Sequence, residues 1–303
     1  MRRPTPDGWT LHFNRVRGDG EPVLMVPGFA MNPYILGFHP RGRSFMEYIA
    51  DSGFDAWSVE LRGLGRNKGG RRRDIGLAER ALVDLPHAIA HVRERTGAER
   101  VHLVGCSLGG SIVYSLLAHE PDADVGKVVS IGGPLWWKDP PLLVRAYARL
   151  GPVIGRVPIR GTRRLARAAL PVISRTVPGV LSLYLNHNNV DLSQPDELVK
   201  TVEDPAPRVN RQLAAWIRSG RLNIRGLDIV GGVGRVQNPL MLVTGSGDGI
   251  APLGACDPVL DAWGGHSEHL HVDGEHPWSH ADLFIGHEAE PKVFAPIAEF
   301  LAR

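Results

Sequence analysis

Residues 100–117, RVHLVGCSLGGSIVYSLL, constrain the fold more than any other part of the chain. The apolar run 101–104 is typical of a buried strand in a parallel sheet. Apolar residues at helical spacing follow at 111–117, so a strand and a helix enclose the turn at 105–109. This turn carries Ser107 in the pattern G-x-S-x-G. Strand, tight turn and helix are the context in which that pattern forms a nucleophile elbow, which lifts the serine hydroxyl clear of the sheet.

The glycines of this turn fit the same interpretation. Gly105 and Gly109 lie two positions before and after Ser107, where the strand and the helix nearly touch and only small residues fit. Gly110 lets the helix lie close to the strand. The alternative is a glycine-rich turn with an incidental serine, and the clear strand and helix patterns on either side argue against it.

The other expected elements alternate between strands and helices. Residues 9–17 alternate apolar and polar side chains, as an outer antiparallel strand would. Further strands are expected at 21–27, 54–61, 125–131, 238–243 and 268–272, and helices at 44–51, 77–96 and 291–301. The alternation predicts an α/β fold with a mostly parallel central sheet flanked by helices.

The character of the sequence changes between residues 135 and 235. Strand–helix alternation gives way there to helical patches interrupted by prolines. We interpret residues 1–134 and 236–303 as the core and residues 135–235 as an inserted helical cap. The alternative is a second independent domain, but about a hundred residues with so many breaks make a poor separate core.

Charge is unevenly distributed along the chain. Residues 135–180 contain nine basic residues and one acidic residue, a net charge of +8, whereas the whole chain carries only +3. Leucines, valines and isoleucines are interleaved with these arginines, which predicts a basic amphipathic surface. Such a cap could contact an anionic membrane peripherally or receive an acidic substrate, or its arginines could simply be solvated.

Other features bear on partners and location. The basic run 71–73 lacks the interleaved aromatic residues of a nucleic-acid surface, so we expect a solvated loop and no nucleic-acid partner.

The N-terminus has basic residues with no apolar stretch after them, and no run reaches the about 18 apolar residues of a membrane span. The two cysteines, Cys106 and Cys256, are too few for a disulfide framework. We therefore expect a cytoplasmic protein.

The elbow and two later segments resemble the α/β-hydrolases, in particular the acid-lipase-like branch of esterases and lipases. The strand at 238–243 runs into TGSGDGIAP, similar to the family's G-x-x-D-x-h-x-P, where h is apolar. Residues 280–286, HADLFIG, are similar to the family's His-x-Asp-hydrophobic-hydrophobic-x-Gly. The resemblance covers residues 23–301, and an inserted cap is usual in this family.

The resemblance implies a catalytic triad of Ser107, Asp248 and His280, in the chain order of this fold. In it, His280 takes the serine proton and Asp248 orients the imidazole. His276 competes for the place of the base, and His280 is preferred because it matches the family motif. Asp248 could also be a turn residue, and Asp282 is expected to be a structural hydrogen-bonding residue.

The resemblance also implies an oxyanion hole formed by the backbone N–H groups of Phe29 and Leu108. The chain has Pro27-Gly28 where the family usually has His-Gly, but the donor is a backbone group in either case. The side chain of Phe29 could be pocket wall or core. The scheme requires no cofactor and no metal, and no spacing such as C-x-x-C or H-E-x-x-H is present.

The expected function is hydrolysis of a carboxylic ester, with a lipid or another apolar acyl ester as the small-molecule substrate. The alternatives are an acyltransferase or polyester depolymerase with the same triad, and a non-catalytic binding protein on the hydrolase scaffold. The serine argues against haloalkane dehalogenase and epoxide hydrolase chemistry, where the family uses an aspartate. Polyester synthases use a cysteine, and Cys106 lies one residue too early.

Overall fold

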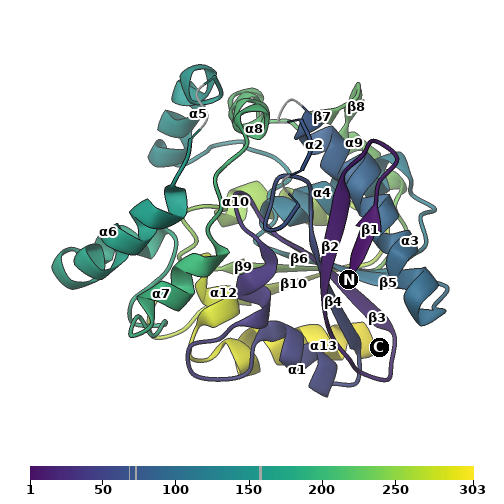
Figure 1. Ribbon diagram of the computed structural model, residues 1–303, viewed down its shortest axis with the longest axis horizontal. Coiled ribbons are helices and arrows are strands. Elements are labelled where there is room, and N and C mark those ends of the chain that lie inside the picture. Colours follow the sequence, from purple (N-terminus) through teal and green to yellow (C-terminus); the bar gives the residue numbers. More distant parts are fainter. Residues whose placement is uncertain (68, 72–73, 157–158) are drawn as a thin grey trace.

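The computed structural model describes residues 1–67, 69–71, 74–156 and 159–303 (Figure 1). Arg72 and Arg73 of the predicted basic loop lie outside these ranges. Within them, eight strands form one sheet in the order β1-β2-β4-β3-β5-β6-β9-β10. The strands are β1 (Arg2–Pro4), β2 (Thr10–Val16), β3 (Pro22–Val26), β4 (Asp55–Glu60), β5 (Val101–Cys106), β6 (Val125–Ile131), β9 (Leu240–Gly245) and β10 (Ser267–Val272).

The pairing is antiparallel only at one edge of this sheet. β2 pairs antiparallel with β1 and with β4, and every pairing from β4 through β3, β5, β6 and β9 to β10 is parallel. The predicted mostly parallel α/β sheet, with residues 9–17 as an outer antiparallel strand, is therefore confirmed. The three-residue strand β1 was not predicted, because so short a strand has too few residues to show alternation.

Helices cover both faces of the sheet (Figure 1). The α-helices are α1 (Phe45–Asp51), α2 (Leu77–Glu79), α3 (Leu85–Thr96), α4 (Leu108–His119), α5 (Leu142–Ile154), α6 (Thr162–Thr176), α7 (Pro195–Leu198), α8 (Pro207–Ser219), α9 (Ile229–Gly232), α10 (Leu253–Cys256), α11 (Pro258–Ala262), α12 (Asp282–Ile285) and α13 (Ala295–Ala302). The short 3₁₀ segments include η1 (Pro33–Gly37), η4 (Pro178–Leu183) and η5 (Val199–Thr201).

Each face of the sheet has its own apolar core, because successive side chains of a strand point to opposite faces. Leu103 and Val128 belong to the core under α3, α4 and α9. Their neighbours Val104 and Val129 belong to the core under α1, α12 and α13. Strands buried on both faces explain why the sequence shows near-continuous apolar runs there.

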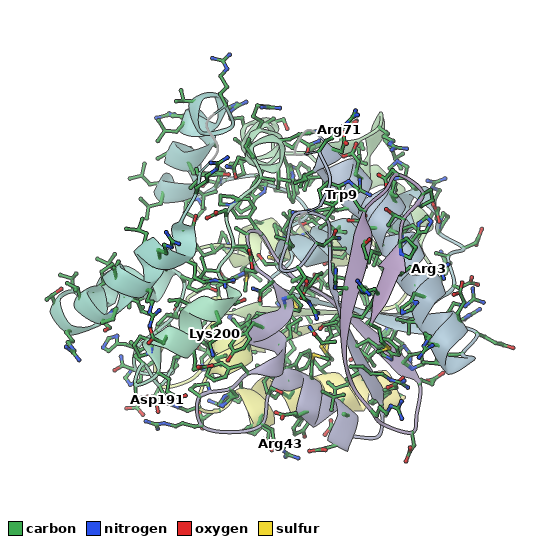
Figure 2. The ribbon with its side chains drawn as sticks, in the orientation of Figure 1. Arg3, Trp9, Arg43, Arg71, Asp191 and Lys200 are labelled. Atoms are coloured by element: carbon green, nitrogen blue, oxygen red, sulfur yellow. The ribbon has the colours of Figure 1, made fainter. Side chains whose placement is uncertain are left out.

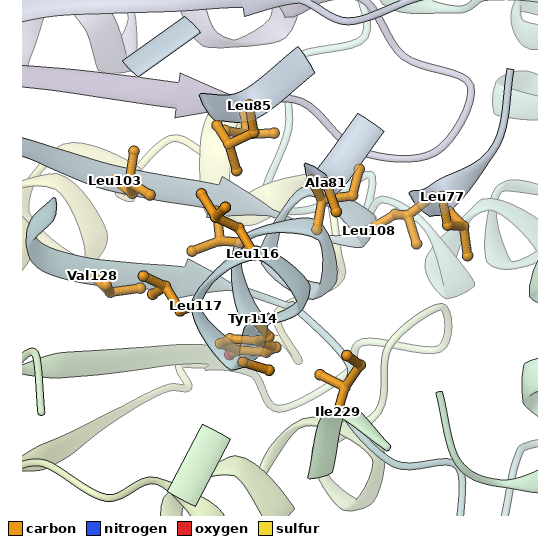
Figure 3. Packing of buried hydrophobic residues seen from close by; sticks show 14 of the residues in the cluster. Leu77, Ala81, Leu85, Leu103, Leu108, Tyr114, Leu116, Leu117, Val128 and Ile229 are labelled. Carbon is orange, nitrogen blue, oxygen red and sulfur yellow. The ribbon is translucent and has the colours of Figure 1, made fainter. Parts of the chain in front are cut away.

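Helix α4 is the centre of the first core. Its Tyr114, Leu116 and Leu117 are fully buried and pack toward Leu103 of β5 and Val128 of β6 (Figure 3). This packing holds the N-terminal end of α4 against the carboxyl ends of the central strands. The start of this helix carries the functional site described below.

Two predicted helices are interrupted by π-turns. The helix expected at 77–96 consists of α2, the π-turn η3 (Arg80–Asp84) and α3, and the expected C-terminal helix begins with the π-turn η7 (Glu290–Phe294). In both cases the residue after the π-turn donates its N–H five residues back, and the next residue is a proline, Pro86 or Pro296. Proline has no N–H and its ring clashes with the carbonyl four residues earlier, so the wider turn accommodates it.

The inserted segment contains α5 to α9 and a small hairpin, β7 (Asn223–Ile224) with β8 (Leu227–Asp228). Helices α5, α6 and α7 lie on the left of Figure 1, beyond the sheet. α5 packs closely on α8, since a Cβ on Gly151 would lie 2.0 Å from the Ala214 Cβ. α9 packs on α4 of the core. The division into a core (1–134 and 236–303) and a cap (135–235) stays a prediction.

In the part of the chain that the structure describes, no helix has the length and apolar character needed to cross a membrane.

Candidate active site

Ser107 occupies a tight corner between β5 and α4, as the elbow motif predicted. Its backbone has φ 53° and ψ −123°, a conformation with positive φ that residues other than glycine rarely adopt. The strained conformation is held by its own hydrogen bonds: Ser107 N donates to Ile131 O of β6 at 2.7 Å, and Ser107 O accepts from Gly110 N at 2.9 Å. The serine is thus fixed at the carboxyl end of the central strands.

The glycines around Ser107 are required by close backbone contacts. A Cβ on Gly105 would lie 2.5 Å from the Gly110 Cα, and a Cβ on Gly109 would lie 2.2 Å from Val26 O of β3. Both distances are far shorter than any real Cβ contact. The expectation that small residues flank the serine, because strand and helix nearly touch, is confirmed.

Asp248 and His280 form a hydrogen-bonded pair near the same corner. The His280 Nδ1 lies 2.6 Å from Asp248 Oδ2, and both side chains are buried. The other carboxylate oxygen, Oδ1, accepts from Ile250 N at 2.9 Å and Ala251 N at 2.8 Å. The turn after β9 therefore fixes the carboxylate, and the carboxylate fixes the orientation of the imidazole ring.

The corner after β6 brings the serine and the histidine into one neighbourhood. Gly132 has φ 57°, and a Cβ there would lie 2.9 Å from His280 Cε1 and 3.3 Å from Asp248 Oδ2. A Cβ on Gly133 would lie 3.3 Å from Ser107 O. The two consecutive glycines thus contact the Asp–His pair on one side and the elbow on the other. The catalytic roles of these residues stay predictions.

Both residues that are predicted to donate to the oxyanion lie next to the serine. Leu108 is the first residue of α4, where backbone N–H groups have no partner within the helix and the helix dipole favours a negative charge. Phe29 follows Gly28, and a Cβ on Gly28 would lie 3.0 Å from the Ser107 Cβ, so the loop after β3 lies directly against the serine. Ala30, the next residue, has φ 50°. The Phe29 side chain lines the cavity at the serine and packs against the core there.

Asp282 and His276, which are not expected to belong to the triad, lie in different surroundings from Asp248 and His280. Asp282 is fully buried and accepts hydrogen bonds from Asn186 N, Asn189 Nδ2 and Ser279 N, each at 2.9 Å. It thus ties the inserted segment to the loop before α12, as expected of a structural residue. His276 is half-buried, and among the described residues it is His280 that bonds to Asp248.

An apolar cavity of about 280 Å³, here called the serine cavity, opens at Ser107. Its walls come from the oxyanion loop, the elbow, the turn after Asp248 and the inserted segment: Phe29, Ser107, Leu108, Pro134, Trp137, Leu143, Val144, Tyr147, Leu183, Leu213, Ile217, Gly249, Ile250 and Ala251. Leu143, Leu183 and Ile250 are also exposed to solvent, so they form its rim.

Neither cysteine is placed to act as a nucleophile. Cys106 and Cys256 are buried and free, and burial raises the pKa of both thiols well above the usual value. A thiol rather than a thiolate is therefore expected at each position. Within the described ranges, no cluster of three or more His, Cys, Asp or Glu side chains is arranged to hold a metal ion.

Sequence reasoning missed the residues that support the histidine and shape the cavity. The Tyr184 ring lies 6.2 Å from the His280 ring, centroid to centroid, and burial beside the Asp248 charge raises the pKa of its hydroxyl to about 12. Gly132, which follows the strand expected at 125–131, belongs to no recognised motif. Tyr147 and Leu213 come from helices of the inserted segment. No local motif marks such residues, since tertiary packing alone brings them to the serine.

The parallel sheet, the strained elbow and the Asp–His pair together define an α/β-hydrolase-type protein. The family model described as "alpha/beta hydrolase fold" matches residues 21–280, and the chain belongs to this family. The resemblance seen in the sequence is thereby confirmed at the level of the family.

Individual relatives are more distant. Human Lipase member N is 31% identical over 136 residues, which span 39% of this chain and 34% of the lipase. The chain thus matches only about a third of the length of the curated lipases it resembles. An esterase, EaEST, from Exiguobacterium antarcticum aligns over 100% of this chain and 99% of its own, with a TM-score of 0.67 and 15% identity. A bromoperoxidase from Bacillus anthracis aligns over 100% of both chains, with a TM-score of 0.67 and 12% identity. At such identities the solved structures show the fold alone.

Proposed function

We propose that the protein is a serine hydrolase that cleaves carboxylic esters with an apolar acyl group. The observation that carries the proposal is the serine cavity, which places the Ser107 elbow, the loop of Phe29 and the turn of Asp248 around one apolar space. Enzymes of this fold place their nucleophile at such an elbow. The esterase and lipase relatives agree with this assignment.

In the proposed reaction, the Ser107 hydroxyl oxygen attacks the ester carbonyl carbon while its proton passes to His280 Nε2. Asp248 accepts the hydrogen bond of His280 Nδ1, which keeps Nε2 unprotonated and stabilises the imidazolium that forms. The Phe29 and Leu108 N–H groups bind the oxygen that gains negative charge, and one such donor is commonly worth about 3 kcal/mol.

The tetrahedral intermediate then collapses. The bond to the alcohol breaks, and the alcohol leaves with the proton from His280, so an acyl ester of Ser107 remains. Water attacks this acyl-enzyme in the same way: one of its protons goes to His280 and its oxygen bonds to the acyl carbon. The bond between the acyl carbon and Ser107 Oγ then breaks, and Oγ takes the proton back from His280. The carboxylic acid is the second product.

The cavity walls favour an apolar acyl chain over a polar one. Val144, Leu213 and Ile217 supply aliphatic surface, and Trp137 and Tyr147 supply aromatic surface. Each buried methylene of the substrate contributes about 0.8 kcal/mol. We therefore expect kcat/KM for p-nitrophenyl esters to rise about four-fold per methylene until the cavity is filled.

A variant that fills the serine cavity tests this substrate assignment. Leu213→Trp, on α8, reduces the space for the acyl chain, so the acyl length with the highest kcat/KM is expected to become shorter. The matched control is Leu170→Trp, which fills a different apolar cavity beside α6. The measurement is kcat/KM for p-nitrophenyl esters from acetate to palmitate. An unchanged optimum in Leu213→Trp, or an equal shift in both variants, would contradict the assignment of the acyl site.

A further inference from the structure

Helices α5 and α6 expose apolar side chains on the faces turned away from the protein. Leu142 on α5 is 75% exposed and Leu165 on α6 is 71% exposed. Other members of this set share helix faces with them at helical spacing: Leu150 and Val153 on α5, and Val172 on α6. Single exposed apolar residues are ordinary, but repeated ones on two successive helices indicate an interaction surface.

These apolar faces are distinct from the faces that attach the two helices. α5 packs on α8 through Ala148 and Gly151, which are buried. α6 turns Ala169 and Ile173 into the apolar cavity of about 250 Å³ on its inner side. Both helices therefore have apolar residues on two sides, and only the inner side is covered by the rest of the chain.

Arginines surround the exposed apolar residues. Arg149, Arg156, Arg160, Arg164 and Arg175 are exposed, and in the described part of the chain they make no ion pair. Other arginines of this segment do pair with acidic residues. Arg163 lies 2.7 Å from Glu203 and Arg167 lies 2.7 Å from Asp196, which ties α6 to the segment before α8.

On α5, the exposed apolar face adjoins the mouth of the serine cavity. Leu143 of α5 is exposed and also lines that cavity. Leu183 and Ile250, which also line this cavity, are exposed as well. Figure 1 shows α5 and α6 on the same side of the molecule, away from α3, and Figure 2 shows the side chains that project from them.

We propose that the outer faces of α5 and α6 bind the surface of an anionic lipid membrane. The leucines and valines would enter the headgroup–acyl boundary, and the five unpaired arginines would contact lipid phosphates. The rim leucines would then face the lipid, so an apolar ester could enter the serine cavity from the membrane. Binding itself does not require catalysis and is measured separately from it.

Charge favours an anionic membrane over a second copy of the chain as the partner of this surface. The exposed arginines that make no ion pair with described residues (Arg149, Arg156, Arg160, Arg164 and Arg175) give this surface a positive charge, so two such faces would repel each other, whereas an anionic bilayer attracts them. The surface also consists of the outer faces of helices. Such a shape suits contact with a lipid bilayer, which is deformable and laterally continuous. A basic face with interleaved leucines is the pattern of helices that lie in the membrane interface.

The test is co-sedimentation with vesicles of phosphatidylcholine alone or of equal parts phosphatidylcholine and phosphatidylglycerol. We expect binding to the mixed vesicles and little to the neutral ones. Binding should weaken in 1 M salt, since the screening length falls from about 10 Å at 0.1 M to about 3 Å. Absence of binding to the mixed vesicles, or equal binding to both, would overturn the proposal.

Two sets of substitutions locate the surface. Arg149→Gln, Arg164→Gln and Arg175→Gln together should lower the partition coefficient roughly 100-fold, because each basic residue near an anionic surface contributes about a factor of five. The matched control removes three exposed arginines elsewhere, by Arg17→Gln, Arg95→Gln and Arg100→Gln, and should change binding far less. Equal losses in the two triple variants would show only a net-charge effect and overturn the assignment of the surface.

The apolar residues are tested with Leu142→Ser, Leu150→Ser and Leu165→Ser combined. The side chains are exposed, so the thermal midpoint should stay within a few degrees of the wild type while vesicle binding falls. Unchanged binding would contradict the proposal, as would sedimentation equilibrium that shows a wild-type dimer and a monomeric variant. Hydrolysis of a soluble short-chain ester should be unaffected in this variant, which separates failure of docking from failure of the proposed catalysis.

Discussion

Replacing Ser107 with alanine is expected to lower kcat for ester hydrolysis by roughly a million-fold, the size of effect seen when a serine nucleophile is removed. Ser107 stands at the elbow, opens onto the serine cavity and has the N-terminal end of α4 directly after it. Alanine has nearly the same volume, and the strained backbone is held by hydrogen bonds of Ser107 N and O, which alanine retains. Activity should therefore be lost without loss of the fold.

The matched control for this variant is Ser115→Ala. Ser115 is a buried serine of α4, the helix that follows Ser107, and its hydroxyl donates to Ser111 O at 2.7 Å. We expect that variant to keep nearly full activity. The measurement is the initial rate of p-nitrophenyl ester hydrolysis, with far-ultraviolet circular dichroism as the check on folding. Residual turnover of Ser107→Ala within ten-fold of the wild type would contradict the assignment of the nucleophile.

Asp248→Asn should lower kcat roughly 10⁴-fold, as loss of the triad carboxylate does in serine proteases. The geometry gives the reason. Asp248 Oδ1 accepts from two backbone N–H groups, so the amide oxygen of asparagine would take that position and its NH₂ group would face His280. His280 Nδ1 would then have to accept a hydrogen bond, which puts the proton on Nε2, where it cannot take one from Ser107.

Asp282→Asn is the matched control for that change. All three hydrogen bonds that Asp282 accepts come from N–H groups, so the NH₂ group of asparagine would face at least one donor and leave it unsatisfied. The expected cost is about 1–3 kcal/mol of folding stability, and kcat of the folded fraction should stay close to that of the wild type. Thermal unfolding and kcat are measured on both variants. The opposite result, with kcat lost in Asp282→Asn and retained in Asp248→Asn, would reverse the assignment of the acid.

Much of the fold could be predicted because its signals are local. The buried strands, the serine turn and the glycines that let β5 and α4 approach each other are all written in short stretches of sequence. The positions of Asp248 and His280 followed from motifs that resemble the family, and the structure brings these two residues into one hydrogen bond. Their chemical roles remain to be measured.

The remaining features depend on contacts between distant segments. A single π-turn before Pro86 or Pro296 adds only one residue to one turn, so the apolar pattern on either side still indicates one uninterrupted helix. Tyr184 meets His280 because several hydrogen bonds anchor the inserted segment there, among them Ala281 N to Tyr184 O and those that Asp282 accepts from Asn186 and Asn189. The sequence showed helical patches in that segment, but neither the bounds of its helices nor the walls they contribute to the serine cavity.

Covalent labelling shows whether Ser107 is an activated nucleophile. The folded protein is treated with a fluorophosphonate, and the adduct is located by mass spectrometry of the intact protein and its peptides. We expect one adduct, on Ser107, that is absent from Ser107→Ala and forms far more slowly in Asp248→Asn, because phosphorus is attacked only by a serine whose proton is being removed. A folded protein that is not labelled, or is labelled at another residue, would contradict the assignment of Ser107 as an activated nucleophile.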